Sequence, residues 1–210
     1  MTDARPAGVI FDLGGVLLTF DHMDICRDLS AVSGLAPEEI YRRVFASGLE
    51  KRYDLGRVTT EEFYTEGLSI LGITPEDLSR EDFERVWADI FSENNDVTRL
   101  LPEIKKRAGL FLLSNTNELH YGMAERRFSF LRGTFDEVFL SFRLGLRKPE
   151  PEVFEAVLDR TGLAPSELFY VDDDPGHVAS ARTLGIDSHV YTSPAKLAEA
   201  LTNRGLLGGD

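Results

Sequence analysis

The sequence has a single cysteine, and it lacks both a long apolar run and a strong basic patch. Cys26 has no partner for an internal disulfide, which agrees with a reducing compartment. Asp12 interrupts the first apolar run after a few residues, too early for the apolar region of a signal peptide or for a membrane span. We therefore expect a cytoplasmic protein.

Positive charge is scarce, since 36 acidic residues outnumber 23 basic ones and the net charge is -13. Such a chain repels nucleic-acid phosphates and anionic lipids unless a local basic patch overcomes the repulsion. The short basic clusters are typical of solvated helix faces; they are Arg42-Arg43, Lys105-Lys106-Arg107 and Arg126-Arg127. We predict neither a nucleic-acid partner nor a membrane partner.

Apolar residues are plentiful, and 42% of 210 residues suffice for one core with a small accessory domain. Five short β-rich runs recur, and helical patterns at 152–161 and 178–184 separate the later ones. The runs are Gly8–Asp12, Gly109–Ser114, Glu137–Ser141, Leu168–Asp172 and Ser188–Tyr191. Strands that alternate with helices predict an α/β fold with a doubly wound parallel sheet.

The chain between the first two runs shows helical periodicity only, punctuated by turns that contain Gly34, Gly56 and Gly72. A small all-helical cap inserted after the first strand explains this stretch economically. We predict a cap domain of residues 21–92 and a core domain that comprises residues 1–20 and 93–210.

Polar residues follow three of the predicted strands, at the carboxyl ends where open parallel sheets bind ligands. Asp12 ends the first strand and precedes Leu13-Gly14-Gly15, where the glycines permit a sharp turn or the close approach of a ligand. An ordinary turn has the same composition. A carboxylate at the tip of a buried strand keeps its charge only if cations, donors or metal ligands compensate it.

Two further strands end in polar groups. The second is followed by Ser114-Asn115-Thr116-Asn117, which can bind an oxyanion or cap the next helix. After the fourth, Asp174 and Pro175 are typical of a helix start. Asp172 and Asp173 remain as neighbouring carboxylates, which a hard divalent cation would stabilise, although a solvated acidic loop has the same sequence.

Lys148 precedes a helix that begins near Glu152, at the helix end where the dipole disfavours a cation. A bound anion would make this placement favourable, because it would interact with both the ammonium group and the helix N-terminus. A lysine that extends along the surface to solvent is the alternative.

In this order, Asp12, Ser114, Lys148 and the pair Asp172-Asp173 resemble the four motifs of the haloacid dehalogenase (HAD) superfamily, and the match spans the chain. Segments 11–17, 113–117 and 147–150 are most similar to its bacterial sugar-phosphatase branch, which includes α-glucose-1-phosphatases. The resemblance implies a Rossmann-like core with a helical cap and a hydrolase that cleaves phosphoric monoesters.

The resemblance also implies a role for each matched residue. Asp12 would be the catalytic nucleophile that forms an aspartyl-phosphate, which water then hydrolyses. Ser114, Asn115 and Lys148 would bind the phosphate, and Lys148 would also neutralise charge during catalysis. Mg²⁺ would be the cofactor, and its ligands would be Asp12, the carbonyl of Gly14, Asp172 and Asp173.

Two positions depart from the family pattern. Gly14 stands where most HAD phosphatases carry an acid that protonates the leaving oxygen, so we expect slow turnover or a preference for less basic leaving groups. The resembled branch often has glycine there, and the hemiacetal oxygen of a sugar 1-phosphate is such a leaving group. His177 replaces an acid or amide; it either helps to position Lys148 or is an ordinary helix histidine.

We hypothesise a Mg²⁺-dependent phosphatase, monomeric or homodimeric, that acts on a small phosphorylated metabolite, a sugar phosphate such as a hexose 1-phosphate. A metal-independent haloacid dehalogenase is the second hypothesis, although it has little use for Asp172-Asp173. A non-catalytic binding protein with the HAD fold is the third. Five residues on the cap side either select the substrate or serve packing alone: Phe20, Asp21, His22, Tyr53 and Asp54.

Overall fold

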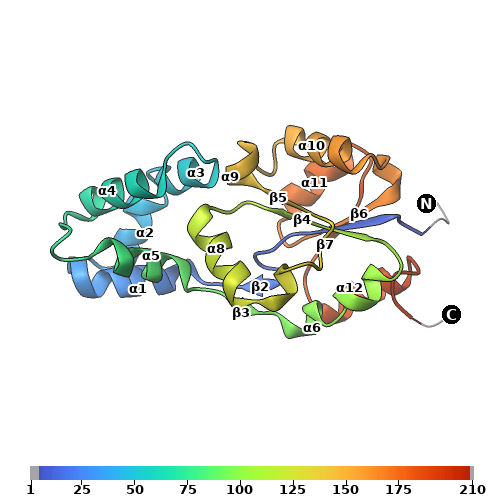
Figure 1. Cartoon of the computed structure of the whole chain (residues 1–210), viewed down its shortest axis with the longest axis horizontal. Coiled ribbons are helices and arrows are strands. Elements are labelled where there is room, and N and C mark those ends of the chain that lie inside the picture. Colours follow the sequence, from blue (N-terminus) through green and yellow to red (C-terminus); the bar gives the residue numbers. More distant parts are fainter. Residues whose placement is uncertain (1–4, 209–210) are drawn as a thin grey trace.

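A five-stranded parallel sheet in the order β5-β4-β1-β6-β7 lies at the centre of the computed structural model (Figure 1). The structure describes residues 5–208, so residues 1–4, 209 and 210 of the predicted core lie outside it. The strands are β1 (Gly8–Phe11), β4 (Gly109–Ser114), β5 (Glu137–Leu140), β6 (Leu168–Asp172) and β7 (Asp187–Val190). All five predicted runs form strands, but Ser141 opens a helix instead of ending β5.

Helices cover both faces of the sheet, which confirms the predicted doubly wound α/β fold. Ile10 of β1 packs on the face of α10 and α11, while Val9 and Phe11 pack on the face of α8 and α12. This alternation follows from the two-residue period of a strand. The helices of this part are α6 (Asn95–Thr98), α7 (Leu101–Lys105), α8 (Glu118–Arg127), α9 (Ser141–Leu144), α10 (Pro151–Thr161), α11 (Pro175–Thr183) and α12 (Pro194–Thr202), with 3-10 turns at Ser129–Leu131 and Pro165–Glu167.

Five helices lie between β2 (Leu18–Thr19) and β3 (Ser92–Glu93), within the stretch whose helical periodicity predicts them, and they form the left part of the molecule in Figure 1. They are α1 (His22–Ser33), α2 (Pro37–Val44), α3 (Leu49–Asp54), α4 (Thr60–Leu71) and α5 (Arg80–Ala88). Phe63 of α4 packs edge-on against Phe83 and Trp87 of α5, which gives this unit an aromatic core. No helix among residues 5–208 combines the length and the apolar content that crossing a membrane requires.

The chain enters and leaves the helical unit through a two-stranded antiparallel ribbon. β2 pairs with β3, and the Asn94 side chain fastens the ribbon by donating to the Val16 carbonyl at 2.8 Å. The ribbon lies at the two predicted domain boundaries. The division into a cap domain and a core domain itself stays a prediction.

The helical unit touches the other part of the molecule next to α9. Gly56, which follows α3, has a φ of +64°, and a Cβ there would lie 2.3 Å from the carbonyl oxygen of Phe142. Only glycine fits so close to a neighbouring backbone. This contact brings α3 to the carboxyl-terminal edge of the sheet, where the predicted site residues lie.

Candidate active site

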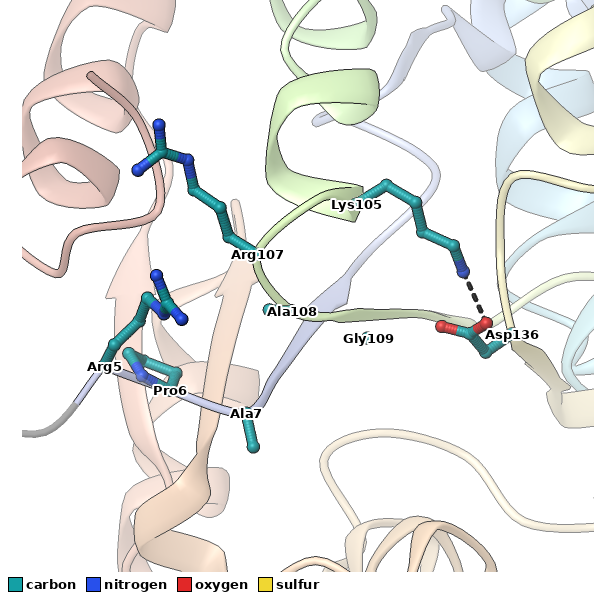
Figure 2. A pocket seen from close by; sticks show the side chains of 8 residues that line it. All are labelled: Arg5, Pro6, Ala7, Lys105, Arg107, Ala108, Gly109 and Asp136. Carbon is teal, nitrogen blue, oxygen red and sulfur yellow. Dashed lines mark ion pairs between the residues drawn. The ribbon is translucent and has the colours of Figure 1, made fainter. Parts of the chain in front are cut away.

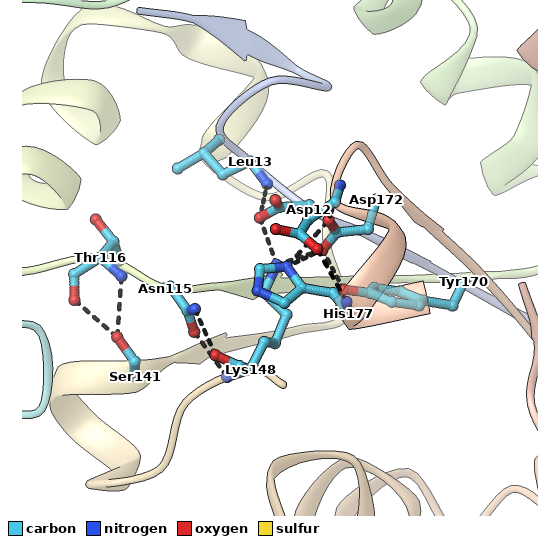
Figure 3. Close-up of polar contacts among 10 residues, drawn as sticks. Asp12, Leu13, Asn115, Thr116, Ser141, Lys148, Tyr170, Asp172 and His177 are labelled. Carbon is cyan, nitrogen blue, oxygen red and sulfur yellow. Dashed lines mark hydrogen bonds and ion pairs between the residues drawn. The ribbon is translucent and has the colours of Figure 1, made fainter. Parts of the chain in front are cut away.

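Three charged side chains meet at the carboxyl ends of β1 and β6 (Figure 3). Nζ of Lys148, in the loop before α10, lies 2.8 Å from Oδ1 of Asp12 and 2.6 Å from Oδ2 of Asp172. The side chains of Lys148 and Asp172 are 0% exposed, and that of Asp12 is 10% exposed. Asp12 directly follows β1 and Asp172 ends β6, so two neighbouring strands deliver both carboxylates to one point.

Asp172 is saturated with hydrogen bonds. Besides the ammonium group, its oxygens accept bonds from the Tyr170 hydroxyl, the Asp174 amide at 2.8 Å and Nδ1 of His177 at 3.1 Å (Figure 3). Tyr170 precedes Asp172 by two residues and therefore lies on the same face of β6. Asp172 therefore contacts both Lys148 and His177, so one carboxylate links the histidine to the lysine.

The electrostatics of the cluster favour a charged lysine. Burial alone would lower the pKa of Lys148, but the carboxylates of Asp12 and Asp172 outweigh it and hold that pKa above its ordinary value. For Asp12, burial dominates and raises the pKa to about 7, although Lys148 opposes the shift. Burial also acts on Asp172, but Lys148 and the hydrogen bonds from His177 and Tyr170 prevail and lower its pKa. A further cation beside Asp12 would favour its ionised form.

The loop after β1 offers oxygen ligands for such a cation. Oδ1 of Asp12 accepts a hydrogen bond from the Leu13 amide at 2.7 Å in addition to the contact with Lys148. Among residues 5–208, no donor is bonded to its Oδ2. Gly14 and Asp12 line one cavity of about 340 Å³. Carboxylate and carbonyl oxygens are the ligands that Mg²⁺ prefers in proteins, so this part of the predicted ligand set suits the metal.

The predicted ligand Asp173 lies against the same loop because Gly15 leaves room for it. Gly15 has a φ of +76°, and a Cβ there would come within 2.1 Å of Oδ2 of Asp173. Burial and the neighbouring Asp172 raise the pKa of Asp173, and a divalent cation would relieve this repulsion. One ligand atom each of Asp12, Asp172 and His177 lies within 4.8 Å of the others, and Asp173 is not part of this group. The carboxylates of the group fit a hard divalent cation.

The polar residues at the end of β4 and in the loop after it have different roles. Ser114 lines the cavity, and none of the described residues hydrogen-bonds its hydroxyl. The Asn115 side chain is engaged by the backbone of Lys148: its Oδ1 accepts from the amide at 2.9 Å and its Nδ2 donates to the carbonyl at 2.9 Å. Asn117 caps α8 by accepting from the His120 amide at 3.0 Å. Asn115 thus uses its side-chain oxygen and one of the two N–H groups of Nδ2 to hold the backbone of Lys148.

The cavity of about 340 Å³ lies over this cluster. The predicted site residues that line it are Asp12, Gly14, Ser114, Asn115, Lys148 and Asp173, while Asp172 is buried beneath them. The structure thus brings all the predicted site residues together. Their individual roles stay predictions.

Three of the five cap-side candidates, Phe20, His22 and Asp54, line the cavity. Asp21 instead caps α1 by accepting from the Met23 amide, and the Tyr53 ring stacks on Phe63 in the aromatic core of the helical unit.

Sequence reasoning missed some residues of this site. Tyr170 had a usable signal, because its position two residues before Asp172 places both on one face of a strand. Glu50 and Arg147 also line the cavity. Glu50 gave no signal, since it resembles the many other acids of this chain until α3 is placed over the sheet.

A larger cavity, of about 620 Å³, lies at the other end of the sheet, where β1 and β4 begin (Figure 2). Its charged side chains are Arg5, Lys105, Arg107 and Asp136. Lys105 pairs with Asp136 at 2.5 Å, and Arg107 donates to the Gly205 carbonyl at 3.4 Å. None of the predicted site residues lines this cavity. Because parallel sheets bind ligands at the carboxyl ends of their strands, we place the active site in the smaller cavity.

Comparisons with known proteins agree with this geometry. The model of the haloacid dehalogenase-like hydrolases matches residues 6–185. A D-ribitol-5-phosphate phosphatase of Bacteroides thetaiotaomicron is 27% identical over 206 residues, which cover 92% of this chain and 96% of that protein. A phosphorylated carbohydrates phosphatase of Thermotoga maritima is 29% identical over 191 residues, which cover 85% and 82%. The structure of a HAD-family enzyme from B. thetaiotaomicron, in complex with magnesium and inorganic phosphate, superposes with a TM-score of 0.80 at 25% identity, over 89% of this chain and 94% of that one.

Proposed function

Because the chain belongs to the haloacid dehalogenase-like hydrolase family, we propose that it is a Mg²⁺-dependent phosphatase acting on a small phosphorylated metabolite. We further propose that this metabolite is a sugar phosphate such as a hexose 1-phosphate. One observation carries the proposal: Asp12 lies 2.8 Å from the buried ammonium group of Lys148, in a cavity that Ser114 also lines.

In the proposed reaction, one carboxylate oxygen of Asp12 attacks the phosphorus of the bound ester, and the other would be the one that binds the cation. The bond between phosphorus and the sugar oxygen breaks, its electron pair leaves on that oxygen, and an aspartyl-phosphate remains. Water then attacks the phosphorus, which releases inorganic phosphate and restores the carboxylate. Leu13 and Lys148 hold Oδ1, so the free oxygen of Asp12 already points in one direction.

Lys148, Ser114 and the backbone amide of Asn115 are the proposed phosphate ligands. Phosphoryl transfer depends chiefly on positioning and on neutralising the equatorial oxygens, and a buried ammonium group does both. Asp172 keeps that ammonium group in place.

Asp12, the carbonyl of Gly14 and Asp173 are the proposed direct ligands of Mg²⁺. When bound, the cation reduces the repulsion between carboxylate and phosphate and stabilises charge on the transferring group. Because Asp172 already accepts four protein hydrogen-bond donors, namely Lys148, Tyr170, His177 and the Asp174 amide, we expect water to mediate its contact with the cation.

An aromatic ring fills the place of the missing general acid. A Cβ at Gly14 would lie 2.7 Å from the Phe20 ring, so a longer side chain fits there only if the ring moves. The leaving oxygen must then take its proton from water or from another group, which favours esters with less basic leaving oxygens. The hemiacetal oxygen of a hexose 1-phosphate meets this condition. The name of the ribitol-phosphate relative makes D-ribitol 5-phosphate the second ester to test.

Phosphate release from glucose 1-phosphate, D-ribitol 5-phosphate and p-nitrophenyl phosphate, with Mg²⁺ and with EDTA, tests the proposal. We expect release that requires Mg²⁺. The isosteric variant Asp12→Asn should lose at least about 10⁴-fold in kcat. Glu38→Gln, which changes an exposed acid of α2, is the control and should retain wild-type turnover.

The same assay separates the alternatives. Release of halide from a 2-haloacid in EDTA, without phosphate release from any ester, would establish the dehalogenase instead. A wild-type protein that does neither would be the non-catalytic binding protein. The cellular location and the choice between monomer and homodimer stay predictions.

A further inference from the structure

Two carboxyl groups of the cap side face the active-site cavity from α3. Glu50 and Asp54 are four residues apart, so they lie on the same face of that helix. Both line the cavity, and so does Arg147, which precedes Lys148 in the chain. The phosphoryl chemistry proposed above uses none of these three side chains.

Asp54 is buried and Glu50 is half-buried, and the protein satisfies both carboxyl groups only in part. Asp54 is 7% exposed; its Oδ1 accepts a hydrogen bond from Nδ2 of Asn117 at 3.0 Å, and no donor among residues 5–208 is bonded to its Oδ2. The Glu50 side chain is 20% exposed, and its Oε1 lies 3.6 Å from Nε2 of His22. Oδ2 of Asp54 and the Glu50 carboxyl group thus have no hydrogen-bond donor among the described residues, and both residues line the cavity, where a ligand can reach them.

Arg147 faces both acids without an ion pair. Burial is the largest effect on Glu50 and Asp54 and raises the pKa of each, to about 8 for Glu50, while the charge of Arg147 acts in the opposite direction. Among the described residues, no salt bridge within 4.0 Å joins Arg147 to either acid. One guanidinium group thus faces two carboxyl groups, which leaves no surplus of positive charge for a second anion.

A hydroxyl group suits this arrangement, because it donates to a carboxylate and accepts from a guanidinium group at the same time. Arg147, Glu50 and Asp54 line the same cavity of about 340 Å³ as Lys148. One small molecule can therefore place a phosphate at Lys148 and hydroxyls beside Arg147.

We infer that Glu50, Asp54 and Arg147 form a hydroxyl-binding subsite, which selects polyhydroxylated monophosphates with an uncharged carbon skeleton. The inference rests on the proposed phosphatase function and names its substrate class. A second phosphate or a carboxylate in the same place would meet the two acids and be disfavoured.

The test compares kcat/KM for D-ribitol 5-phosphate with kcat/KM for p-nitrophenyl phosphate, an ester without hydroxyl groups. Glu50→Met keeps the length of the side chain and removes its hydrogen bonding, so the ratio should fall by at least about tenfold. Asp54→Asn preserves an acceptor for Asn117 and should also lower the ratio. This second variant keeps the test decisive if Glu50→Met fails to fold. Glu38→Met on the exposed side of α2 is the matched control, and its ratio should stay within about twofold of the wild type.

The wild type should also prefer D-ribitol 5-phosphate to 3-phosphoglycerate, which carries a carboxylate. An unchanged ratio in both variants, or a preference for 3-phosphoglycerate, would overturn the subsite and leave the phosphatase function standing. A wild type that hydrolyses none of these three esters with Mg²⁺ present would overturn the proposed function, and the subsite with it.

Discussion

Asn117 donates a hydrogen bond from Nδ2 to Oδ1 of Asp54 at 3.0 Å, and this bond joins the start of α8 to the cap-side helix α3. The same side chain accepts from the His120 amide at 3.0 Å and thereby caps α8. Both Asn117 and Asp54 are buried. One amide group therefore starts a helix on the sheet side of the cavity and fixes the opposite wall relative to it.

This double role predicts an unusual order of stability for variants of Asn117. Asn117→Ala should cost about 1–3 kcal/mol, because α8 loses its cap and Asp54 loses a donor. Asn117→Asp should cost more at pH 8, although aspartate caps helices as well as asparagine, because it places a second carboxylate against Asp54. Urea unfolding measures both. An aspartate variant more stable than the alanine variant would contradict the assigned bond.

Lys148→Met should lower both turnover and stability. The change leaves Asp12 and Asp172 as buried carboxylates without their cation, which should cost about 3–5 kcal/mol of unfolding free energy. Mg²⁺ should restore part of this loss, since it neutralises the same charges. Thermal unfolding in EDTA and in Mg²⁺ measures the effect, with Lys196→Met on an exposed part of α12 as the control. A Lys148→Met variant as stable in EDTA as the wild type would show that the ion pairs of Lys148 with Asp12 and Asp172 contribute little to stability.

Gly15→Ala should weaken Mg²⁺ binding. The new Cβ would lie 2.1 Å from Oδ2 of Asp173, so the carboxylate must move away. Gly145→Ala is a matched control, because Gly145 has a similar φ of +69° but has open space around the Cβ position. Both variants should lose about 1 kcal/mol of stability through the left-handed backbone. Only Gly15→Ala should raise the Mg²⁺ concentration for half-maximal turnover, by about tenfold or more; an equal requirement would argue against Asp173 as a ligand.

His120 should make folding stability sensitive to acid. Its Nε2 bonds the Trp87 carbonyl at 2.9 Å and its Nδ1 lies 3.1 Å from Nδ2 of Asn117, so the ring is held neutral with the proton on Nε2. Burial lowers the pKa of His120 to about 3. The unfolded chain takes up a proton near pH 6.5 and the folded protein does not, so stability is lost as the pH falls from about 6.5 toward 3.

The expected contribution of His120 to this loss is about 2 kcal/mol at pH 5. His120→Gln should therefore show a smaller difference between unfolding free energies at pH 8 and pH 5 than the wild type does. The comparison between two pH values removes the cost of the substitution itself. Equal differences in the two proteins would mean that the histidine is protonated in the folded state.

Much of the fold could be predicted because its signals are local. Short apolar runs, glycine turns and helix caps depend on neighbouring residues, so the five strands and the Asp174 cap were found within a residue of their observed positions. Ser141 was misplaced because the end of a buried strand and the start of a short helix have similar side chains. The Ser141 hydroxyl also joins the start of α9 to the loop after β4, since it accepts from the Thr116 amide at 2.9 Å and donates to the Thr116 carbonyl.

The sequence identified the residues of the candidate site that lie at strand ends, but not the functions of the residues in the loops. Asp12 directly follows a strand of one parallel sheet, and Ser114 and Asp172 are the last residues of two others. Parallel strands place their carboxyl ends together. The Asn115 side chain hydrogen-bonds the backbone of Lys148. No local sequence pattern separates an asparagine with this structural role from one that binds phosphate. That distinction depends on a loop 33 residues away along the chain.

The sequence alone determined which groups are available at the sheet edge: a carboxylate after the first strand, an acid pair, a hydroxyl and a lysine, all in the order of one hydrolase family. Tertiary structure alone decided which of their atoms remain free, because hydrogen bonds are directional and each one uses an atom that chemistry would otherwise need. It also decided which cap-side acids face the cavity, because the packing of α3 against the sheet joins residues whose separation along the chain carries no local signal.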